Sequence, residues 1–334
     1  GVDPCKKYKV AVKITIEDGK VKMDFTGTAK QAPGFTNMPP AGAKAACAIA
    51  YLMLINPGTE IATNEGLFSS LECYFPKGSI LNPNFPAATI VGNQIADVLL
   101  EAIMNAFKEA VPDEVTAGWC KACPPVFSGT DPRKGEPYFD FGFMAKSGQG
   151  ALKGYDGFDG IGFAGAAGCM RSQDPEMLEI KDPFFVEAYE YLPDSAGSGQ
   201  YRGGYGTYIK MRIDGENNSV GTLGDGMEYE GAEKPKGLFG GLEGTSNDYI
   251  LHFPDNSTRK LGSKDMVFQV PKGTVLEMYS GGGGGYGSPA LRDVQKVQEE
   301  VTAGLLSLEK AKEDYGGEID PETGVVTVIR PGIG

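Results

Sequence analysis

Clustered glycine is the feature that most limits what this chain can fold into. The sequence has 334 residues and 49 glycines, and the densest cluster is the run Gly281–Gly285, followed by Tyr286-Gly287-Ser288-Pro289. The clusters follow no fixed period, which excludes a collagen-type repeat. Glycine adopts turn conformations closed to other residues, so the pattern predicts many tight turns between short elements.

The first half of the chain combines strands with helices. Alternating residues in Tyr8–Ile16 and Lys20–Phe25 flank the Asp-Gly signal of a β-hairpin. Ala41–Ile55 is rich in Ala, Leu and Met and predicts a buried helix, and Leu71–Phe75 predicts a strand. Helical spacing of apolar residues in Asn93–Ala110 predicts a second helix, with Asn93 as its N-cap and Pro112 beyond its end.

The second half is richer in β-structure. Residues 115–170 show no clear period and predict a long loop-rich stretch. Short β-rich runs then predict an antiparallel domain: Phe184–Tyr191, Tyr205–Ile213, Val220–Leu223, Tyr249–Phe253, Met266–Val270 and Thr274–Tyr279. Ala290–Tyr315 predicts two helices broken near Gly304, and Gly324–Ile329 a last strand. We therefore expect an α+β, β-rich chain with a few long helices, divided into 1–170 and 171–334.

Charge and composition exclude several classes of partner. The formal net charge is -13, which repels nucleic-acid phosphates and anionic lipid surfaces. No segment has the roughly 20 successive apolar residues of a membrane-spanning helix. Six cysteines are too few for a disulfide scaffold in a chain this long. We expect a cytoplasmic protein that binds neither nucleic acid nor membrane.

Few residues point to catalysis. His252 is the only histidine and lies in an apolar strand-like run, which excludes a multi-histidine metal site and favours a structural role. Cys120 and Cys123 form a C-x-x-C pair that fits buried structural thiols, half of a metal site or a redox pair. We therefore expect no metal site within the chain, with these two cysteines as its only candidates.

Two further segments allow a structural and a binding role. Gly281, Gly282, Gly283, Gly284 and Gly285 fit a tight structural turn, or consecutive backbone N–H groups that contact an anion or a partner chain. No Gly-Lys-Ser/Thr ending follows them, so they do not form a nucleotide-binding P-loop.

Arg202 lies among small residues, where its guanidinium can clamp loop carbonyls or grip a carboxylate. The acidic pairs Asp156/Asp159, Asp174/Glu176 and Glu187/Glu190 lack EF-hand spacing and fit solvated surface.

A series of short motifs runs along the chain in a fixed order: Asp24–Gly27, Asn64–Gly66, Pro76, Gly78-Ser79, Leu81–Pro83, Gly92-Asn93, Asp194-Ser195, Tyr201–Gly204, Gly237–Gly241, Gly281–Pro289, Arg292-Asp293, Ala311 and Tyr315-Gly316. In these motifs the chain resembles the C-terminal half of the hydantoinase B, oxoprolinase and acetone carboxylase alpha family. The resemblance covers nearly the whole chain.

The resemblance implies one subunit of a multi-subunit, ATP-dependent enzyme that is not active alone. A hydantoinase A-type partner subunit is expected to bind ATP and Mg and to phosphorylate a small-molecule substrate. Members open cyclic amides such as hydantoins and 5-oxoproline, or carboxylate ketones such as acetone and acetophenone through a phosphorylated enol. A purely structural subunit is a third reading.

The chain departs from the family pattern in two places. The histidine-containing half with its divalent metal (Zn, Mn or Fe) lies upstream in family members, so a separate chain supplies it or the chain was cleaved before Gly1. Residues 171–175 replace a typical Asn-Thr-Pro element, which favours ketone carboxylation. We expect Arg202 to bind an anion, Asn64 and Asn93 to line the site, and Phe158, Phe163 and Met170 to exclude water.

Overall fold

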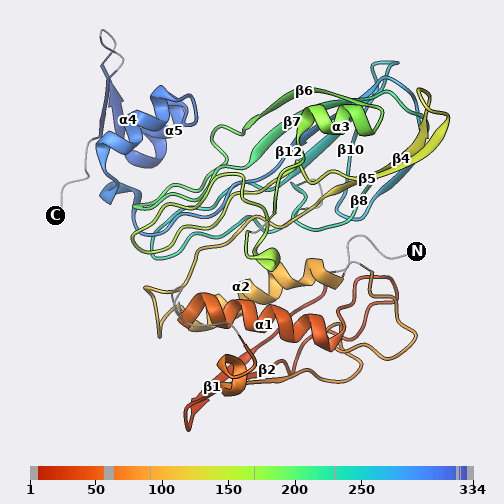
Figure 1. Ribbon diagram of the computed structural model, residues 1–334. Coiled ribbons are helices and arrows are strands. Elements are labelled where there is room, and N and C mark those ends of the chain that lie inside the picture. Colours follow the sequence, from red (N-terminus) through yellow and green to blue (C-terminus); the bar gives the residue numbers. More distant parts are fainter. Residues whose placement is uncertain are drawn as a thin grey trace. The chain divides into compact units, whose positions relative to one another are not determined.

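The fold is a mixed α+β arrangement, as predicted. The computed structural model describes residues 7–55, 64–90, 92–168, 170–228, 231–320, 323 and 325–328. They form two compact units, residues 1–115 and 116–334 (Figure 1). This division lies upstream of the expected boundary at residue 170, because Gly118, Gly148 and Gly157 donate backbone hydrogen bonds to residues 202–281 of the second unit.

The first unit contains a three-stranded sheet. Strands β1 (Lys13–Glu17) and β2 (Lys20–Asp24) form the predicted antiparallel hairpin. Both turn residues, Asp18 and Gly19, have positive φ, as the turn of a two-residue hairpin requires. Strand β3 (Leu71–Tyr74) pairs in parallel with β2 and places Cys73 opposite Met23. The hairpin and the strand at residue 71 are therefore confirmed.

Two helices complete the first unit. Helix α1 (Pro40–Ile55) buries five residues, whereas Ala41, Lys44 and Ala45 are exposed. The predicted helix is confirmed, but only one side of it is buried. Helix α2 (Ile95–Phe107) buries the predicted apolar face. It starts later than expected, after the 3-10 turn η2 (Gly92–Gln94), so Asn93 is not its N-cap. A second 3-10 turn is η1 (Leu67–Ser70).

Two antiparallel sheets form a sandwich in the second unit. The five-stranded sheet has the order β10-β9-β12-β7-β6, and the four-stranded sheet has the order β11-β8-β4-β5. The strands are β4 (Pro125–Asp131), β5 (Glu136–Phe141), β6 (Phe184–Tyr191), β7 (Thr207–Ile213), β8 (Glu216–Thr222), β9 (Asp248–His252), β10 (Thr258–Lys260), β11 (Met266–Val270) and β12 (Thr274–Tyr279). Alternate residues face inward and fill the core, among them Phe127, Met211, Val220, Leu251 and Leu276.

Two elements beside the predicted strands were missed: a hairpin within residues 115–170, which were expected to be loop-rich, and a short helix after them. The hairpin β4–β5 buries Tyr138 and Asp140 on one face of β5. Its sequence signal was a short alternation of buried and exposed residues after the Asp131-Pro132 turn. Helix α3 (Pro175–Lys181) begins with Asp174, whose carboxylate accepts a hydrogen bond from Met177 N at 2.9 Å. Asp174 is therefore the N-cap of this helix. The sequence Asp-Pro-Glu is a recognisable signature of such a helix start.

Glycine-rich segments form a second layer beyond the strand ends (Figure 1). We call them the glycine bundle: residues 116–119, 147–151, 156–160, 195–206, 235–245 and 280–288. They run extended and exchange backbone hydrogen bonds, for example Gly148 N to Gly281 O at 3.0 Å and Gly204 N to Gln149 O at 2.7 Å. A 3-10 turn, η3 (Ala164–Ala166), follows the third segment.

The C-terminal part is helical, as predicted. After the 3-10 turn η5 (Pro289–Leu291) come α4 (Val294–Thr302) and α5 (Leu308–Tyr315), then the pair β13 (Gly317–Ile319) and β14 (Val326–Val328). Gly304 breaks the helices with a positive φ. Residues 324 and 329 of the expected last strand lie outside the described residues. No helix in the described part of the chain has the length and apolarity to cross a bilayer.

Candidate functional site

A buried group of charges ties the glycine bundle to helix α4. Arg202 donates from Nε to Glu300 Oε1 at 2.6 Å and from Nη1 to Asp159 Oδ1 at 2.7 Å. Arg292, only 1% exposed, donates from Nη1 to Asp156 Oδ1 at 2.8 Å and from Nη2 to the same Glu300 oxygen at 2.6 Å. We call these five residues the double-arginine cluster. Asp156 and Asp159, expected on solvated surface, are instead its anions.

Lys296 balances the charge of this cluster. Lys296 Nζ lies 3.3 Å from Asp156 Oδ2, so three cations face three carboxylates. Burial acts to raise the pKa of Asp156, but hydrogen bonding and the charge of Arg292 outweigh it and hold this pKa below its usual value. Because the charges are paired and hydrogen-bonded, they join the bundle without an uncompensated charge.

The guanidinium group of Arg202 is engaged within this cluster. Nη1 also donates to Gly203 O at 2.8 Å, Nη2 lies 3.2 Å from Asp159 Oδ2, and the group stacks 4.4 Å from the centre of the Tyr205 ring. A substrate carboxylate would have to displace one of these partners. The contacts therefore match the clamp that the sequence left open as an alternative to anion binding.

The run Gly281–Gly285 forms neither a tight turn nor an open row of N–H groups. All five residues are buried, and their N–H groups donate in order to Asn247 Oδ1, Thr245 Oγ1, Gly204 O, Gly118 O and Leu242 O at 2.8–3.3 Å. None has a positive φ. A Cβ on Gly283 would meet Gln149 O at 1.9 Å, so close approach of backbones, not turn geometry, requires these glycines.

The other predicted site residues are distributed over the two units. Asn64 Oδ1 accepts from Gly66 N at 2.9 Å in an exposed turn of the first unit, and the side chain of Asn93 lies outside the described residues. In the second unit Phe163 is half-buried, and Phe158 is 67% exposed. These positions stay predictions for substrate contacts.

The C-x-x-C sulfurs point to different partners. Cys120 Sγ donates to Asn247 Oδ1 at 3.4 Å, and Cys123 Sγ to Ser263 O at 3.8 Å, and both residues are buried. No group of three or more His, Cys, Asp or Glu able to hold a metal occurs among the described residues. His252 pairs with Glu277 across neighbouring strands at 2.9 Å. A metal role for Cys120 and Cys123 stays untested.

Lys146 is a candidate that the sequence analysis missed. It is 5% exposed, its Nζ donates to Met170 O, and no carboxylate partner is seen for it in the described part of the chain. Burial lowers the pKa of its ammonium group. Two hydrogen bonds between its backbone and Thr207 Oγ1, both 3.0 Å, fix it at the start of β7. The available signal in the sequence was a lysine between small residues. Once buried, its ammonium group can stabilise a nearby negative charge.

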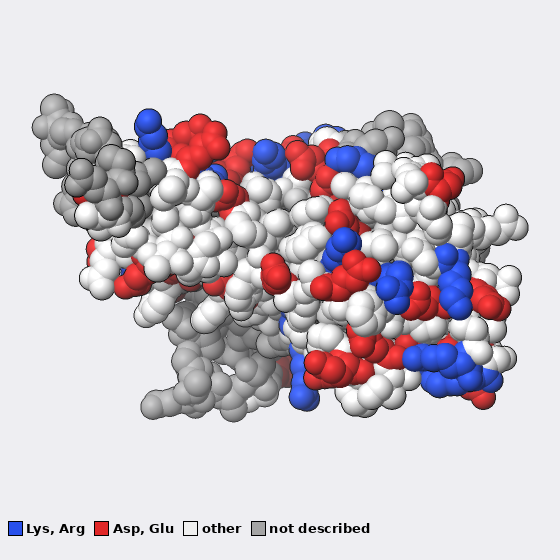
Figure 2. Space-filling model, turned by 90° about the horizontal axis from the view of Figure 1, so that it is seen from above, with Lys and Arg blue, Asp and Glu red and all other residues white. Residues whose placement is uncertain are grey.

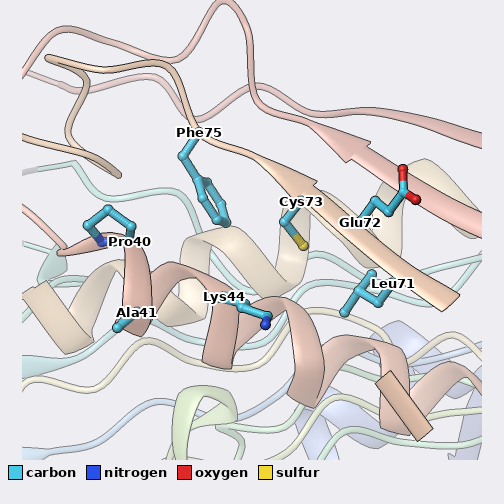
Figure 3. A pocket seen from close by; sticks show the side chains of 7 residues that line it. All are labelled: Pro40, Ala41, Lys44, Leu71, Glu72, Cys73 and Phe75. Carbon is cyan, nitrogen blue, oxygen red and sulfur yellow. The ribbon is translucent and has the colours of Figure 1, made fainter. Parts of the chain in front are cut away.

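The first unit contains an open pocket of about 500 Å³ between α1 and β3 (Figure 3). Lys44 contributes a positive charge, while Glu72 pairs with Lys20 on the neighbouring strand. Cys73 points its sulfur toward α1 in this view. The lining residues are Pro40, Ala41, Lys44, Leu71, Glu72, Cys73 and Phe75.

One face of the molecule mixes both signs of charge. On the face shown in Figure 2, basic side chains lie next to acidic ones and form no continuous positive stripe. A phosphate backbone on this face would meet carboxylates as well as ammonium groups.

Comparisons with known proteins give the family. A family model described as Hydantoinase B/oxoprolinase matches residues 2–289. The B-type subunit of a putative D-/L-hydantoinase from Pseudomonas sp. (strain NS671) is 30% identical over 329 residues, 94% of this chain and 52% of that protein. This chain thus spans about half the length of that relative.

Two solved structures share the fold. The ATP-dependent caprolactamase from Pseudomonas jessenii has a TM-score of 0.80 at 25% identity, over 94% of this chain and 54% of that one. A nucleotide-free acetone carboxylase structure has a TM-score of 0.81 at 20% identity, over 95% of this chain and 46% of that one. With the family match over most of its length, the chain belongs to the hydantoinase B/oxoprolinase family.

Proposed function

We propose that the chain is the C-terminal half of a B-type subunit in an ATP-dependent enzyme that opens a cyclic amide. The observation that carries this proposal is the 30% identity with the B-type subunit of a putative hydantoinase along 94% of the chain. The caprolactamase likeness supports the same chemistry, since hydantoins and caprolactam are both cyclic amides. This choice departs from the sequence-based preference for ketone carboxylation.

The proposed enzyme divides its chemistry among chains. A hydantoinase A-type partner would bind ATP and Mg, and a histidine-containing half outside this chain would hold a divalent metal (Zn, Mn or Fe). ATP would activate the amide carbonyl, whose resonance otherwise makes ring opening slow. The described residues here offer no metal donor set, so this chain's part is to shape and support the site.

Lys146 is the residue of this chain that we propose to face developing negative charge. A buried ammonium group with a carbonyl partner is an electrostatic donor in a low-dielectric setting. Thr207, at the start of β7, holds the Lys146 backbone in place through two hydrogen bonds. Arg202, engaged in the double-arginine cluster, would act on the position of this region and not on the substrate.

Ketone carboxylation is the second candidate. The replacement of Asn-Thr-Pro by residues 171–175 favours it, and the acetone carboxylase structure shares the fold. In that reaction a phosphorylated enol must be shielded from water before it meets bicarbonate. Phe163 and Met170 would line such a cavity.

The test is an ATPase and product assay on the complex purified with its native partners. ATP turnover that requires hydantoin, 5-oxoproline or caprolactam, with ring-opened product, supports the proposal. Turnover that requires acetone or acetophenone with bicarbonate replaces it with the second candidate. ATP turnover that responds to neither substrate class, in a complex containing every partner, would overturn both.

A matched pair of variants tests the part played by this chain. Lys146→Met removes the buried charge, and Lys272→Met removes an exposed one. We expect Lys146→Met to lower kcat at least about tenfold, a loss typical of one electrostatic contact to the transition state. Unchanged kcat in both variants would remove Lys146 from the proposal.

A further inference from the structure

Two thiols of the first unit interact, and one of them lines its pocket. Cys73 is half-buried on β3 and lines the pocket, whereas Cys47 is fully buried on α1. Side chains two residues apart on a strand share a face, so Leu71 and Cys73 both turn toward α1. On α1, Lys44 precedes Cys47 by three residues and shares its side of the helix. The fold thus gathers two sulfurs and one ammonium group.

The two thiols have opposite acid–base character. Cys47 donates a side-chain hydrogen bond to Cys73, and this bond together with the charge of Lys44 lowers the pKa of Cys73, although burial opposes the shift. The same hydrogen bond and its burial raise the pKa of Cys47. The more exposed member of the pair is therefore the one that ionises first, and the thiolate is the reactive form of cysteine.

We propose that Cys73 is an oxidation site for a peroxide, with Cys47 as its resolving thiol. The Cys73 thiolate attacks one peroxide oxygen; an S–O bond forms, the O–O bond breaks, and water leaves after protonation. The resulting sulfenic acid is attacked by the Cys47 sulfur; an S–S bond forms, the S–O bond breaks, and a second water leaves. The two thiols supply the two electrons that reduce the peroxide.

The arrangement differs from that of the other described cysteines. Cys120 and Cys123 are both buried, their sulfurs donate to unrelated partners, and neither lines this pocket. Burial hides them from a dissolved oxidant. They are therefore internal controls for a reaction that selects Cys73 by access and by its neighbours.

The experiment treats the folded 334-residue chain with hydrogen peroxide and maps its peptides by mass spectrometry. We expect a Cys47–Cys73 cross-link that a dithiol reductant removes. Cys47→Ser should instead leave a Cys73 sulfenic acid that dimedone traps, and Cys73→Ser should abolish both products. Lys44→Met should slow the reaction several-fold, whereas Cys123→Ser should not alter it.

Three results would overturn the proposal. One is oxidation of Cys120 or Cys123 before Cys73 in the folded chain. Another is a dimedone adduct on Cys73 that persists in the unsubstituted chain without a cross-link, which removes the resolving role of Cys47. The third is unchanged Cys73 under peroxide that modifies an unfolded sample completely. None of these outcomes depends on which reaction the enzyme catalyses.

Discussion

The sandwich and the glycine bundle follow one another along the same strands, yet they pack by opposite means. In the sandwich, side chains such as Phe127 and Leu276 fill the space between two sheets. In the bundle, the absence of side chains lets backbones approach until a Cβ on Gly283 would lie 1.9 Å from a carbonyl oxygen. One layer excludes water with apolar volume, and the other with backbone hydrogen bonds and buried ion pairs.

This difference predicts reversed tolerance to substitution. Replacing a bundle glycine by a larger residue should unfold the bundle. Replacing an apolar core residue by a smaller one should destabilise the sandwich. Four substitutions, each with a matched control or a reference protein, test that contrast from the largest expected effect to the smallest.

Gly283→Ala should prevent folding of the second unit. The added methyl group would overlap Gln149 O. The atoms that it meets are backbone atoms, which cannot rotate away as a side chain can. Gly135→Ala is the matched control: its φ is positive but nothing lies within 4 Å of the added carbon, so about 1–2 kcal/mol of strain is expected. Circular dichroism and soluble yield compare the two; equal losses would contradict close approach as the cause.

Arg292→Met should cost about 3–5 kcal/mol, because it leaves Asp156 and Glu300 buried without their partner. Chemical denaturation of the second unit measures the loss. Arg259→Met is the control, since its ion pair with Asp265 is exposed and should contribute about 1 kcal/mol or less. Similar costs for both would mean that the bundle does not depend on its buried charges.

Leu276→Ala should destabilise the sandwich by about 2–5 kcal/mol through a cavity in its fully buried core. Phe268→Ala, on a side chain 71% exposed, should change stability by about 0.5 kcal/mol or less. The same denaturation experiment serves both variants. A tolerated Leu276→Ala would show that the bundle alone holds the unit together.

Lys146→Met should have the smallest effect on stability, about 1 kcal/mol or less and in the stabilising direction at neutral pH. Because the folded pKa of Lys146 lies below its ordinary value of about 10.4, unfolding takes up a proton between these two pH values. Wild-type stability should therefore rise with pH in that window relative to Lys146→Met. A difference between the two proteins that stays constant with pH would contradict a buried, charged lysine.

Local patterns predicted the elements whose own residues determine them. The Asp18-Gly19 turn requires positive φ at both positions, and the spacing of Leu99, Ile103 and Phe107 gives α2 its buried face, so both were readable. The hairpin β4–β5 was missed because Gly129 and Pro137, two residue types that are uncommon inside strands, interrupt its pattern. Within the candidate site, Arg202 was found but not its partners.

The sequence by itself determined the α+β class, the family motifs and the clustering of glycine, because propensity and periodicity act over neighbouring residues. Only the tertiary structure decided the role of those glycines, which is to let backbone segments pack closely. Gly283 needs no Cβ because Gln149, far away in the chain, passes against it, and Arg202 is a clamp because Glu300 reaches it from α4. Contacts between residues this distant in sequence depend on the packing of the whole unit, which no local pattern contains.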